Sequence, residues 1–544
     1  MAASARADAP APPSVEFSPS PPTRAKESPS PPPPPPSALE SPSAASGTPY
    51  RLPPLSLLEA VPPESQREIR SDLHEIGRTL VETLAEFGIE TQLTNVEQGP
   101  VVTRFELLPA PGVRVERIAG LSNNIALALK AESVRVQAPI PGKGVVGIEV
   151  PNIKTTLVYL REVLESDTWR RYDAALPLAI GKDVGGRVIV SDLTDMPHLL
   201  IAGATGSGKT ICMNALLLGL LMSRTPEELR LLLVDPKIVE FSAYNQLPHL
   251  VAPVITDPKK VALGLRWAIA EMEKRYKLFA RVGVRNIKAF NARPIERQAE
   301  LFPTESPASE ETDANAIPTR LPYILIVVDE LADLMLVAQA DIENSIARLA
   351  QLSRAVGIHM VLATQRPSVN VITGTIKANF PARIAFQVAQ KVDSRTILDA
   401  NGADKLLGKG DMLFLPPGTS KMIRAQGCMV SDTEVRSVVE FIRSQSEPRF
   451  ETAIREKLDK KTPELPEMEE DDTLIEQAIE IIRQTQRAST SSLQRRLRIG
   501  YTRAARIMDL LEERGIVGPA QGSDPREILI DLSGEIPKNE DTGT

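Results

Sequence analysis

The sequence has few cysteines, few aromatic residues and no long apolar run. Cys212 and Cys428 are the only cysteines among 544 residues, too few for a disulfide framework and spaced unlike a zinc site, so a reducing cytoplasmic setting is expected. Aromatic residues are 4% of the chain, so aliphatic side chains must form most of the core. The longest uncharged aliphatic stretch, Ile211 to Met222, is shorter than the roughly 20 residues of a bilayer span. The start of the chain lacks an apolar signal segment. We therefore expect no membrane segment in this chain.

The chain also lacks a strong overall charge. Its 63 basic and 70 acidic residues give a formal net charge of −7, which excludes a uniformly basic protein of the histone type. A nucleic-acid-binding surface would have to be confined to one part of the chain.

Proline is abundant but unevenly placed. Fifteen of the 47 prolines lie in residues 1–50, including the run Pro31–Pro36, so residues 1–52 are predicted to be a disordered tail rich in Pro, Ser and Ala. Residues 53–150 follow with a helical pattern over Glu68 to Phe87 and a strand pattern over Val101 to Leu108. They predict a small α+β domain.

Residues 151–461 alternate short aliphatic strands with helices. The strands expected to lie side by side are His198–Ala202, Leu231–Val234, Tyr323–Val328, His359–Ala363 and Arg383–Phe386. Because these runs are apolar on both faces, they indicate an α/β domain with a mostly parallel sheet covered by helices on both sides. A polar stretch over 293–320 is predicted to be a surface insertion, and the acidic residues 462–472 a linker.

Residues 203–210 read GATGSGKT and match the phosphate-binding loop pattern G-x-x-x-x-G-K-[ST] at every fixed position. This pattern alone is weak evidence for a nucleotide site, because it occurs in many unrelated chains. Here, however, an apolar strand precedes it and an aliphatic helix follows it. Lys209 would supply positive charge to the phosphates of ATP, and Thr210 a hydroxyl to Mg²⁺. The residues predicted to cradle the nucleotide are Gly203, Ala204, Thr205, Gly206, Ser207, Gly208, Lys209 and Thr210.

Two carboxylates end the strand Tyr323–Val328. Asp329 is expected to hold Mg²⁺ through water, and Glu330 to polarise the attacking water of an ATPase reaction. An acidic strand cap without catalytic function is the alternative. Gln365, at the end of another strand, could sense the γ-phosphate or be a structural amide.

No arginine lies in the loop or beside Asp329, although phosphoryl transfer gains from a further positive charge. A neighbouring subunit could supply it through Arg348 or Arg354, and either arginine could instead be a surface ion-pair partner.

The C-terminal unit, residues 473–534, reverses the charge of the chain. Seven arginines and no acids lie between Arg483 and Arg506, on a pattern of three helices followed by two short strands. This predicts a winged-helix domain that binds DNA, with Thr502, Arg506 and Asp509 on one outward stripe of the third helix. Winged helices also bind proteins, which remains an alternative. Residues 535–544 are predicted to be disordered.

These features closely resemble the FtsK/SpoIIIE family of DNA translocases over about residues 55–532. The most specific stretches are LLVDPKIVEFSAYNQLPHL (231–250), SRAVGIHMVLATQRPSVNVITGTIKANFPARIAFQV (353–388), DSRTILDANGADKLLGKGDMLFLPPG (393–418) and RRLRIGYTRAARIMDLLEERGIV (495–517). The resemblance implies an α domain, a RecA-like P-loop β motor that forms a homohexameric ring around double-stranded DNA, and a γ winged-helix domain that orients movement. One departure is Thr502, where the family commonly has Asn.

The resemblance also assigns residue roles. It selects Arg354 over Arg348 as the arginine that acts across the subunit boundary, and it implies a site-specific recombinase as a possible partner of the γ domain. The cations matching the channel positions are Arg366, Lys377, Lys391 and Arg395. The γ-domain residues expected at DNA are Arg495, Arg496, Thr502, Arg503, Arg506 and Asp509.

The implied function is Mg²⁺-dependent, ATP-driven translocation of double-stranded DNA in chromosome segregation at cell division. The alternatives are a conjugative or plasmid-transfer motor, a secretion motor of similar fold, and a DNA-bound regulator that uses ATP as a switch.

Overall fold

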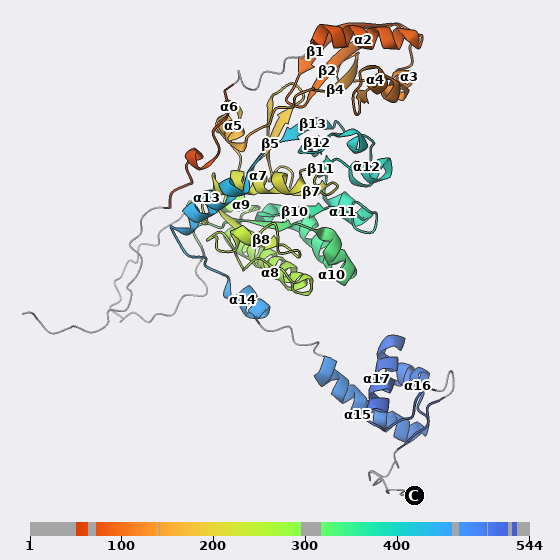
Figure 1. Ribbon diagram of the computed structural model, residues 1–544. Coiled ribbons are helices and arrows are strands. Elements are labelled where there is room, and N and C mark those ends of the chain that lie inside the picture. The colour runs from red at the N-terminus through yellow and green to blue at the C-terminus, as the bar shows by residue number, and fades with distance from the viewer. Residues whose placement is uncertain are drawn as a thin grey trace, which may run out of the picture. The chain divides into compact units, whose positions relative to one another are not determined.

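The computed structural model describes residues 50–63, 72–140, 142–294, 317–459, 467–497, 499–520 and 525–529. Most of the predicted tail and of the 293–320 insertion, and the predicted 535–544 terminus, therefore lie outside the described residues. Figure 1 gives the labels of the elements.

The first domain is a four-stranded antiparallel sheet with helices packed on it (Figure 1). In the spatial order β1-β2-β4-β3, its strands are β1 (Thr91–Gln98), β2 (Val102–Pro109), β4 (Val146–Pro151) and β3 (Arg135–Gln137). Its helices are α2 (Leu73–Glu86), α3 (Val115–Gly120) and α4 (Ser122–Ala128). Asp72 caps α2 by accepting hydrogen bonds from the amides of His74 and Glu75. Leu80 and Leu84, one turn apart, are buried beside Phe105 in its core.

The second domain is built on a nine-stranded sheet in the order β6-β5-β13-β12-β11-β7-β10-β9-β8. Its strands are β5 (Pro177–Asp183), β6 (Val188–Asp192), β7 (His198–Ala202), β8 (Leu229–Val234), β9 (Tyr323–Val328), β10 (Ile358–Thr364), β11 (Ala382–Phe386), β12 (Asp411–Leu415) and β13 (Ile423–Gly427). The five strands from β11 to β8 are parallel, as predicted. The other four pair antiparallel, and they are not among the strands named from the sequence.

Helices cover both faces of this sheet (Figure 1). The helices are α5 (Leu160–Leu164), α6 (Asp167–Arg171), α7 (Lys209–Leu221), α8 (Pro258–Val282), α9 (Ile287–Ala292), α10 (Leu331–Leu352), α11 (Gly374–Asn379), α12 (Lys391–Leu398), α13 (Asp432–Arg443) and α14 (Thr452–Asp459). Alternate residues of each central strand enter two separate cores: Leu199 and Ile201 pack with α7, whereas Leu200 and Ala202 pack with the face that holds α8 and α10. The predicted α/β layering is thereby confirmed.

The short helix η1 (Leu55–Leu57) departs from the predicted domain division. Leu58 is buried in the core of the second domain, and Tyr50 makes an edge-on ring contact with His249 there. The start of the described chain thus packs on the second domain, although the sequence predicted a tail to residue 52 and the first domain from 53.

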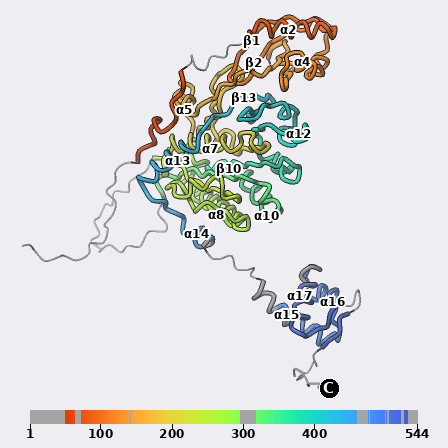
Figure 2. Tube along the Cα trace, viewed as in Figure 1, coloured from red at the N-terminus to blue at the C-terminus, as the bar shows by residue number. Residues whose placement is uncertain are grey.

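The C-terminal unit has three helices, α15 (Glu467–Thr485), α16 (Thr490–Leu497) and α17 (Tyr501–Glu513) (Figure 2). Ile482, Leu493 and Ile507, one from each helix, are buried in their common core. Bridges between Val517 and Ile528 and between Ala488 and Arg526 join the strand segments. Helix α15 begins inside the predicted linker, consistent with the high helix propensity of glutamate and its favourable place in a first turn.

Two further observations bear on the sequence-based expectations. No helix in the described part of the chain has both the length and the apolar character that a bilayer span needs. Both cysteines are free and buried.

Candidate functional site: an ATP site at the carboxyl edge of the sheet

The predicted phosphate-binding loop connects β7 to α7 at the carboxyl edge of the parallel strands. Gly206 and Gly208 have φ angles of +76° and +114°, which L side chains rarely adopt. A Cβ atom on Gly208 would lie 2.5 Å from the Gly410 nitrogen, whose N–H donates to the Ser207 carbonyl. The loop therefore needs glycine at position 208 both for its backbone angles and for its contact with the 408–410 segment.

Lys209 and Asp329 form a buried ion pair in this site. The Nζ atom of Lys209 lies 2.6 Å from Asp329 Oδ1 and 2.7 Å from the Asp329 carbonyl oxygen, and the side chains are 3% and 0% exposed. Burial raises the pKa of Asp329, and the nearby Lys209 opposes this only in part. The two predicted residues are thus brought together, with the lysine bound to the acid at the place where phosphates would compete for it.

The oxygen atoms at this site fit Mg²⁺. Asp329 Oδ2 is buried and has no hydrogen-bond partner among the described residues. The Thr210 hydroxyl donates to Glu240 Oε1 at 2.8 Å, which leaves its oxygen lone pairs available. No cluster of three or more His, Cys, Asp or Glu side chains suited to a metal occurs among the described residues. Such a sparse oxygen set is typical of Mg²⁺ sites completed by substrate phosphates and water.

Glu330 follows Asp329 and is 1% exposed. Its Oε1 accepts from the Thr364 hydroxyl at 2.7 Å, its Oε2 lies 2.9 Å from Lys237 Nζ, and the Gln365 amide donates to both oxygens at 3.2 Å. Burial would raise the pKa of Glu330, but the hydrogen bonds from Thr364 and Lys237 outweigh it and hold the pKa below its ordinary value. Glu330 is therefore ionised at neutral pH, and both of its carboxylate oxygens accept hydrogen bonds.

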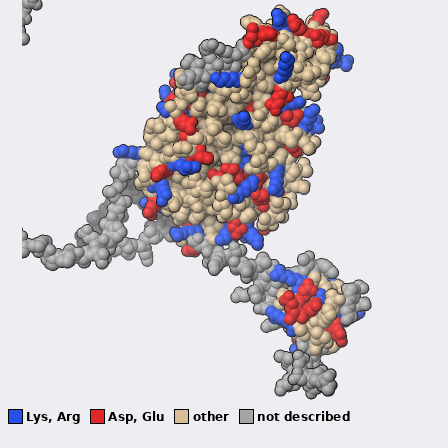
Figure 3. All heavy atoms as spheres, in the orientation of Figure 1, with Lys and Arg blue, Asp and Glu red and all other residues tan. Residues whose placement is uncertain are grey.

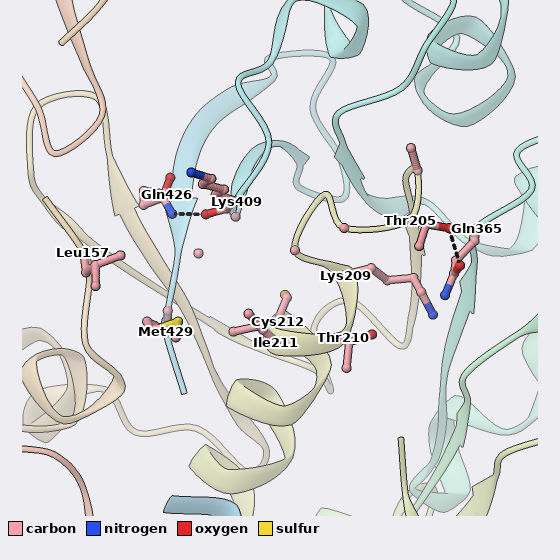
Figure 4. Close-up of a pocket in the computed structure, with 16 residues that line it drawn as sticks. Leu157, Thr205, Lys209, Thr210, Ile211, Cys212, Gln365, Lys409, Gln426 and Met429 are labelled. Atoms are coloured by element: carbon pink, nitrogen blue, oxygen red, sulfur yellow. Dashed lines mark hydrogen bonds between the residues drawn. The ribbon is translucent and has the colours of Figure 1, made fainter. Parts of the chain in front are cut away.

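Gln365 lies close to the phosphate-binding loop. Its side-chain Oε1 accepts from the Thr205 hydroxyl at 2.7 Å, a contact drawn in Figure 4. The end of strand β10 thus places Gln365 at the loop.

A cavity of about 390 Å³ opens beside the loop, within the range of small-molecule sites. Figure 4 shows Lys209 and Thr210 on one side of it, and Leu157 and Met429 on the other. Its lining residues are Leu157, Ala204, Thr205, Gly206, Gly208, Lys209, Thr210, Ile211, Cys212, Gln365, Lys409, Gly410, Gln426, Gly427, Cys428 and Met429. The phosphate-binding loop thus meets an apolar wall against which a nucleotide base could pack.

Sequence reasoning missed three residues of this site, namely Lys237, Glu240 and Lys409, and it placed Thr364 beside Gln365 at the strand end without a role of its own. One available signal was the end of β8: parallel neighbouring strands finish at the same edge, so the Asp-Pro-Lys after β8 must lie beside Asp329 and Glu330. The contacts themselves could not be read from spacing.

Arg354 lies at the opposite edge of the sheet from the ATP site. It begins the short helix η3 (Arg354–Val356), before β10, whereas the loop and Asp329 follow the carboxyl ends of β7 and β9. A seven-residue strand is about 23 Å long, so Arg354 cannot reach its own site. It is exposed, and no ion pair is recorded for it among the described residues. Arg348, by contrast, is ion-paired with Glu273.

The four predicted channel cations lie between β10 and the end of α12. Arg366 and Lys391 are exposed. Lys377 pairs with Asp399 at 2.6 Å, and Arg395 donates to the Asn401 side chain at 2.8 Å. Figure 3 shows basic and acidic side chains interspersed over the visible face of the second domain, without a large area of one sign.

The C-terminal unit has the predicted winged-helix arrangement. Arg495, Arg496 and Arg506 are exposed, whereas the side chains of Thr502 and Arg503 lie outside the described residues. Asp509, expected on the outward stripe, pairs with Arg526 of the wing at 2.6 Å. Arg526 also binds Glu512 at 2.6 Å. The acid at 509 therefore has a structural contact that the sequence did not reveal.

The fold and this site define a P-loop ATPase with an added winged helix. The family model of FtsK/SpoIIIE matches residues 159–369, that of the FtsK alpha domain 52–152 and that of the FtsK gamma domain 469–531. Together these matches cover more than half of the sequence, and the chain belongs to the FtsK/SpoIIIE family.

Curated relatives agree. DNA translocase FtsK of Clostridium acetobutylicum is 50% identical over 496 residues, which cover 90% of this chain and 62% of the relative. DNA translocase SpoIIIE of Bacillus subtilis is 48% identical over 481 residues, covering 88% and 59%. This chain thus spans about three fifths of the length of these relatives. Among solved structures, the pCW3 conjugation coupling protein TcpA is 22% identical with a TM-score of 0.46, covering 68% of this chain and 100% of that one.

Proposed function

We propose that this chain hydrolyses ATP in order to move double-stranded DNA. The observation that carries the proposal is the convergence of Lys209, Asp329 and Glu330 at the loop between β7 and α7, in a chain that also has a basic winged helix. The relatives named DNA translocase support it.

The chain's own residues divide the work at the ATP site. The loop amides and Lys209 would bind the phosphates, so Lys209 must leave Asp329 when ATP arrives. Glu330 would orient and activate the attacking water. When bound through Thr210 and Asp329, Mg²⁺ would neutralise charge on the phosphate oxygens. Gln365, which contacts Thr205, would respond to the terminal phosphate.

A second copy of the chain would complete the site. Because Arg354 is exposed at the far edge of the sheet from its own ATP site, it fits a role in the site of an adjacent subunit. Repetition of this contact around a ring corresponds to the homohexamer implied by the family resemblance.

Basic side chains of the ring channel would bind the DNA phosphates, and the winged helix would recognise the base sequence. Arg366, Lys377, Lys391 and Arg395 are proposed to contact phosphates in the ring channel, which would make movement salt-sensitive and independent of sequence. The DNA sequence would be read by helix α17, through contact of Arg506 with a base edge. The other proposed DNA contacts of this domain, to phosphates, are Arg495, Arg496 and Arg503, together with Thr502. Such a motor would act in the cytoplasm in chromosome segregation at cell division, with a site-specific recombinase as a candidate partner of the γ domain.

ATP turnover by the full chain tests this proposal against a DNA-bound switch. Linear duplex should raise Mg²⁺-dependent ATP hydrolysis, and the increase should shrink as salt rises. Tight ATP and DNA binding without an increase in turnover would favour the switch.

A further inference from the structure

The segment Asp235–Phe241, which follows β8, forms a strap over the carboxyl edge of the sheet. Asp235 is 1% exposed and fastens both ends: its Oδ1 accepts from the Lys237 amide at 3.1 Å and its Oδ2 from the Phe241 amide at 2.9 Å. Between these anchors, Ile238 has a φ angle of +57°, an unfavourable angle for a β-branched residue. Ile238 and Val239 are 64% and 66% exposed. The strap is thus fixed at its ends and strained and exposed at its tip.

Lys237 joins this strap to Glu330. Its ammonium group lies 2.9 Å from Glu330 Oε2, and its side chain is 35% exposed, whereas that of Glu330 is 1% exposed. The acid is also bound by the Thr364 hydroxyl and by the Gln365 amide. Asp235 anchors the backbone amide of Lys237, but the Lys237 side chain is 35% exposed, so its ammonium group can rotate away from Glu330 without unpacking the domain. Thr364 and the Gln365 amide have no such freedom.

A carboxylate with these partners is poorly placed to activate water. Both oxygens of Glu330 already accept hydrogen bonds, one of them from a cation, and hydrogen bonds to an ionised carboxylate are about twice as strong as bonds between neutral groups. A water molecule would have to displace one donor before it could be oriented. Lys237 is the displaceable donor because a long, partly exposed side chain carries its ammonium group, whereas Thr364 is buried and the Gln365 and Ala332 donors are backbone amides.

We propose that Lys237 is a positioning residue that holds Glu330 in a resting arrangement, and that hydrolysis begins only after the Lys237 side chain withdraws from it. The inference rests on the proposed function, since it assigns a restraint to the same ATP site. It makes Lys237 the residue that keeps ATP turnover low until DNA is bound.

Lys237→Met in the full chain tests the inference, because methionine keeps most of the side-chain volume and removes the charge. ATP turnover without DNA should rise about tenfold, with the DNA-stimulated maximum unchanged, so the stimulation ratio falls by the same factor. Lys237→Arg should restore low turnover without DNA. Lys259→Met, which alters an exposed lysine on α8, is the matched control and should leave both rates unchanged.

Nucleotide affinity provides a readout that does not depend on turnover. Calorimetric binding of a non-hydrolysable ATP analogue should stay within about twofold of the parent value in Lys237→Met. A loss of tenfold or more for the ATP analogue, with ADP binding unchanged, would place Lys237 on the terminal phosphate and overturn the inference. A fall in turnover without DNA, or no change in it, would overturn it as well.

A second variant covers the case in which Lys237→Met fails to fold. Thr364→Val removes another donor to Glu330 at nearly constant volume and should raise turnover without DNA in the same direction. If it does not, Glu330 is not restrained by these contacts and the inference fails. A parent chain that shows no DNA-stimulated hydrolysis would overturn the proposed function itself, an outcome distinct from an active parent with an unresponsive Lys237 variant.

Discussion

Two clusters of charged side chains in this molecule are both buried, but they differ in how many of their carboxylate oxygens have a hydrogen-bond partner. In the ATP site, Lys209 meets only one oxygen of the Asp329 carboxylate, and the other has no partner among the described residues. Between the first domain and the nine-stranded sheet, Arg424 of β13 binds Asp411 at 2.6 Å and Glu149 of β4 at 2.9 Å. Arg135 also binds Glu149, at 3.0 Å.

The pKa directions follow the pairing. Burial would raise the pKa of Glu149, but the charges of Arg135 and Arg424 outweigh it and lower the pKa below its ordinary value. All four carboxylate oxygens of Glu149 and Asp411 accept hydrogen bonds. The pKa of Asp329 is raised instead. A complete cluster holds domains together, whereas an incomplete one is ready to exchange partners when a ligand arrives.

The largest expected effect comes from removing Lys209, the cation of the incompletely paired cluster. Lys209→Ala removes the charge that would bind the transferred phosphate, so DNA-stimulated ATP hydrolysis should fall at least about a hundredfold. A coupled assay of ATP turnover measures this, with Lys259→Ala as the control. Retention of more than a tenth of the parent rate would show that Lys209 is not essential to the chemistry.

Replacing one carboxylate of each cluster by an amide should lower the free energy of unfolding by different amounts. Glu149→Gln breaks a buried and fully bonded network, so the free energy of unfolding should fall by about 3–5 kcal/mol. Asp329→Asn removes a charge that burial already disfavours, and the change should stay within about 1 kcal/mol. Denaturant unfolding of both variants makes the comparison. Equal losses would contradict the distinction drawn between the clusters.

Low pH should remove the stabilisation that the Glu149 carboxylate gives through its bonds to Arg135 and Arg424. Because the folded-state pKa of Glu149 is lowered, its stabilising contribution is present above the ordinary pKa of about 4.3 and is lost as the pH falls through the folded value. The difference in unfolding free energy between the parent and Glu149→Gln should therefore be full at pH 7 and shrink below about pH 4. A difference that stays constant with pH would mean that packing, not charge, links the two domains.

An exposed charge sharpens the contrast further, since it should affect recognition and not stability. Arg506→Ala should abolish the orientation preference of movement, a discrimination worth about 1–3 kcal/mol, while bulk DNA-stimulated hydrolysis is kept. Movement on duplexes with the preferred site in each orientation measures it. Equal loss of orientation and hydrolysis would contradict a separate reading domain.

The smallest effect is expected from the wing. Asp509→Asn weakens an ion pair with Arg526 in which Asp509 is 65% exposed, so the γ domain should lose less than about 1 kcal/mol of stability. Thermal unfolding of the γ-domain transition in the full chain would detect it. A loss above about 2 kcal/mol would place this pair with the buried clusters.

The sequence predicted those parts of the molecule that local pattern determines. The phosphate-binding loop and Asp329 could be found because a motif and a strand end fix their surroundings. Arg424 and Glu149 are 275 residues apart, so their pairing depends on how two sheets meet and leaves no local signal. The restraint of Glu330 by Lys237 required the neighbouring positions of β8 and β9, which only the sheet order supplies. Asp509 was assigned to the outward stripe from helical spacing, which does not reveal the wing residue Arg526.

Displacement of a third strand from a linear duplex tests the central claim, that ATP hydrolysis drives movement along DNA. The parent chain should displace a triplex-forming strand far from its loading site only when ATP and Mg²⁺ are present, and Lys209→Ala should not. DNA-stimulated hydrolysis without any displacement would contradict the account, because ATP would then be used for something other than translocation.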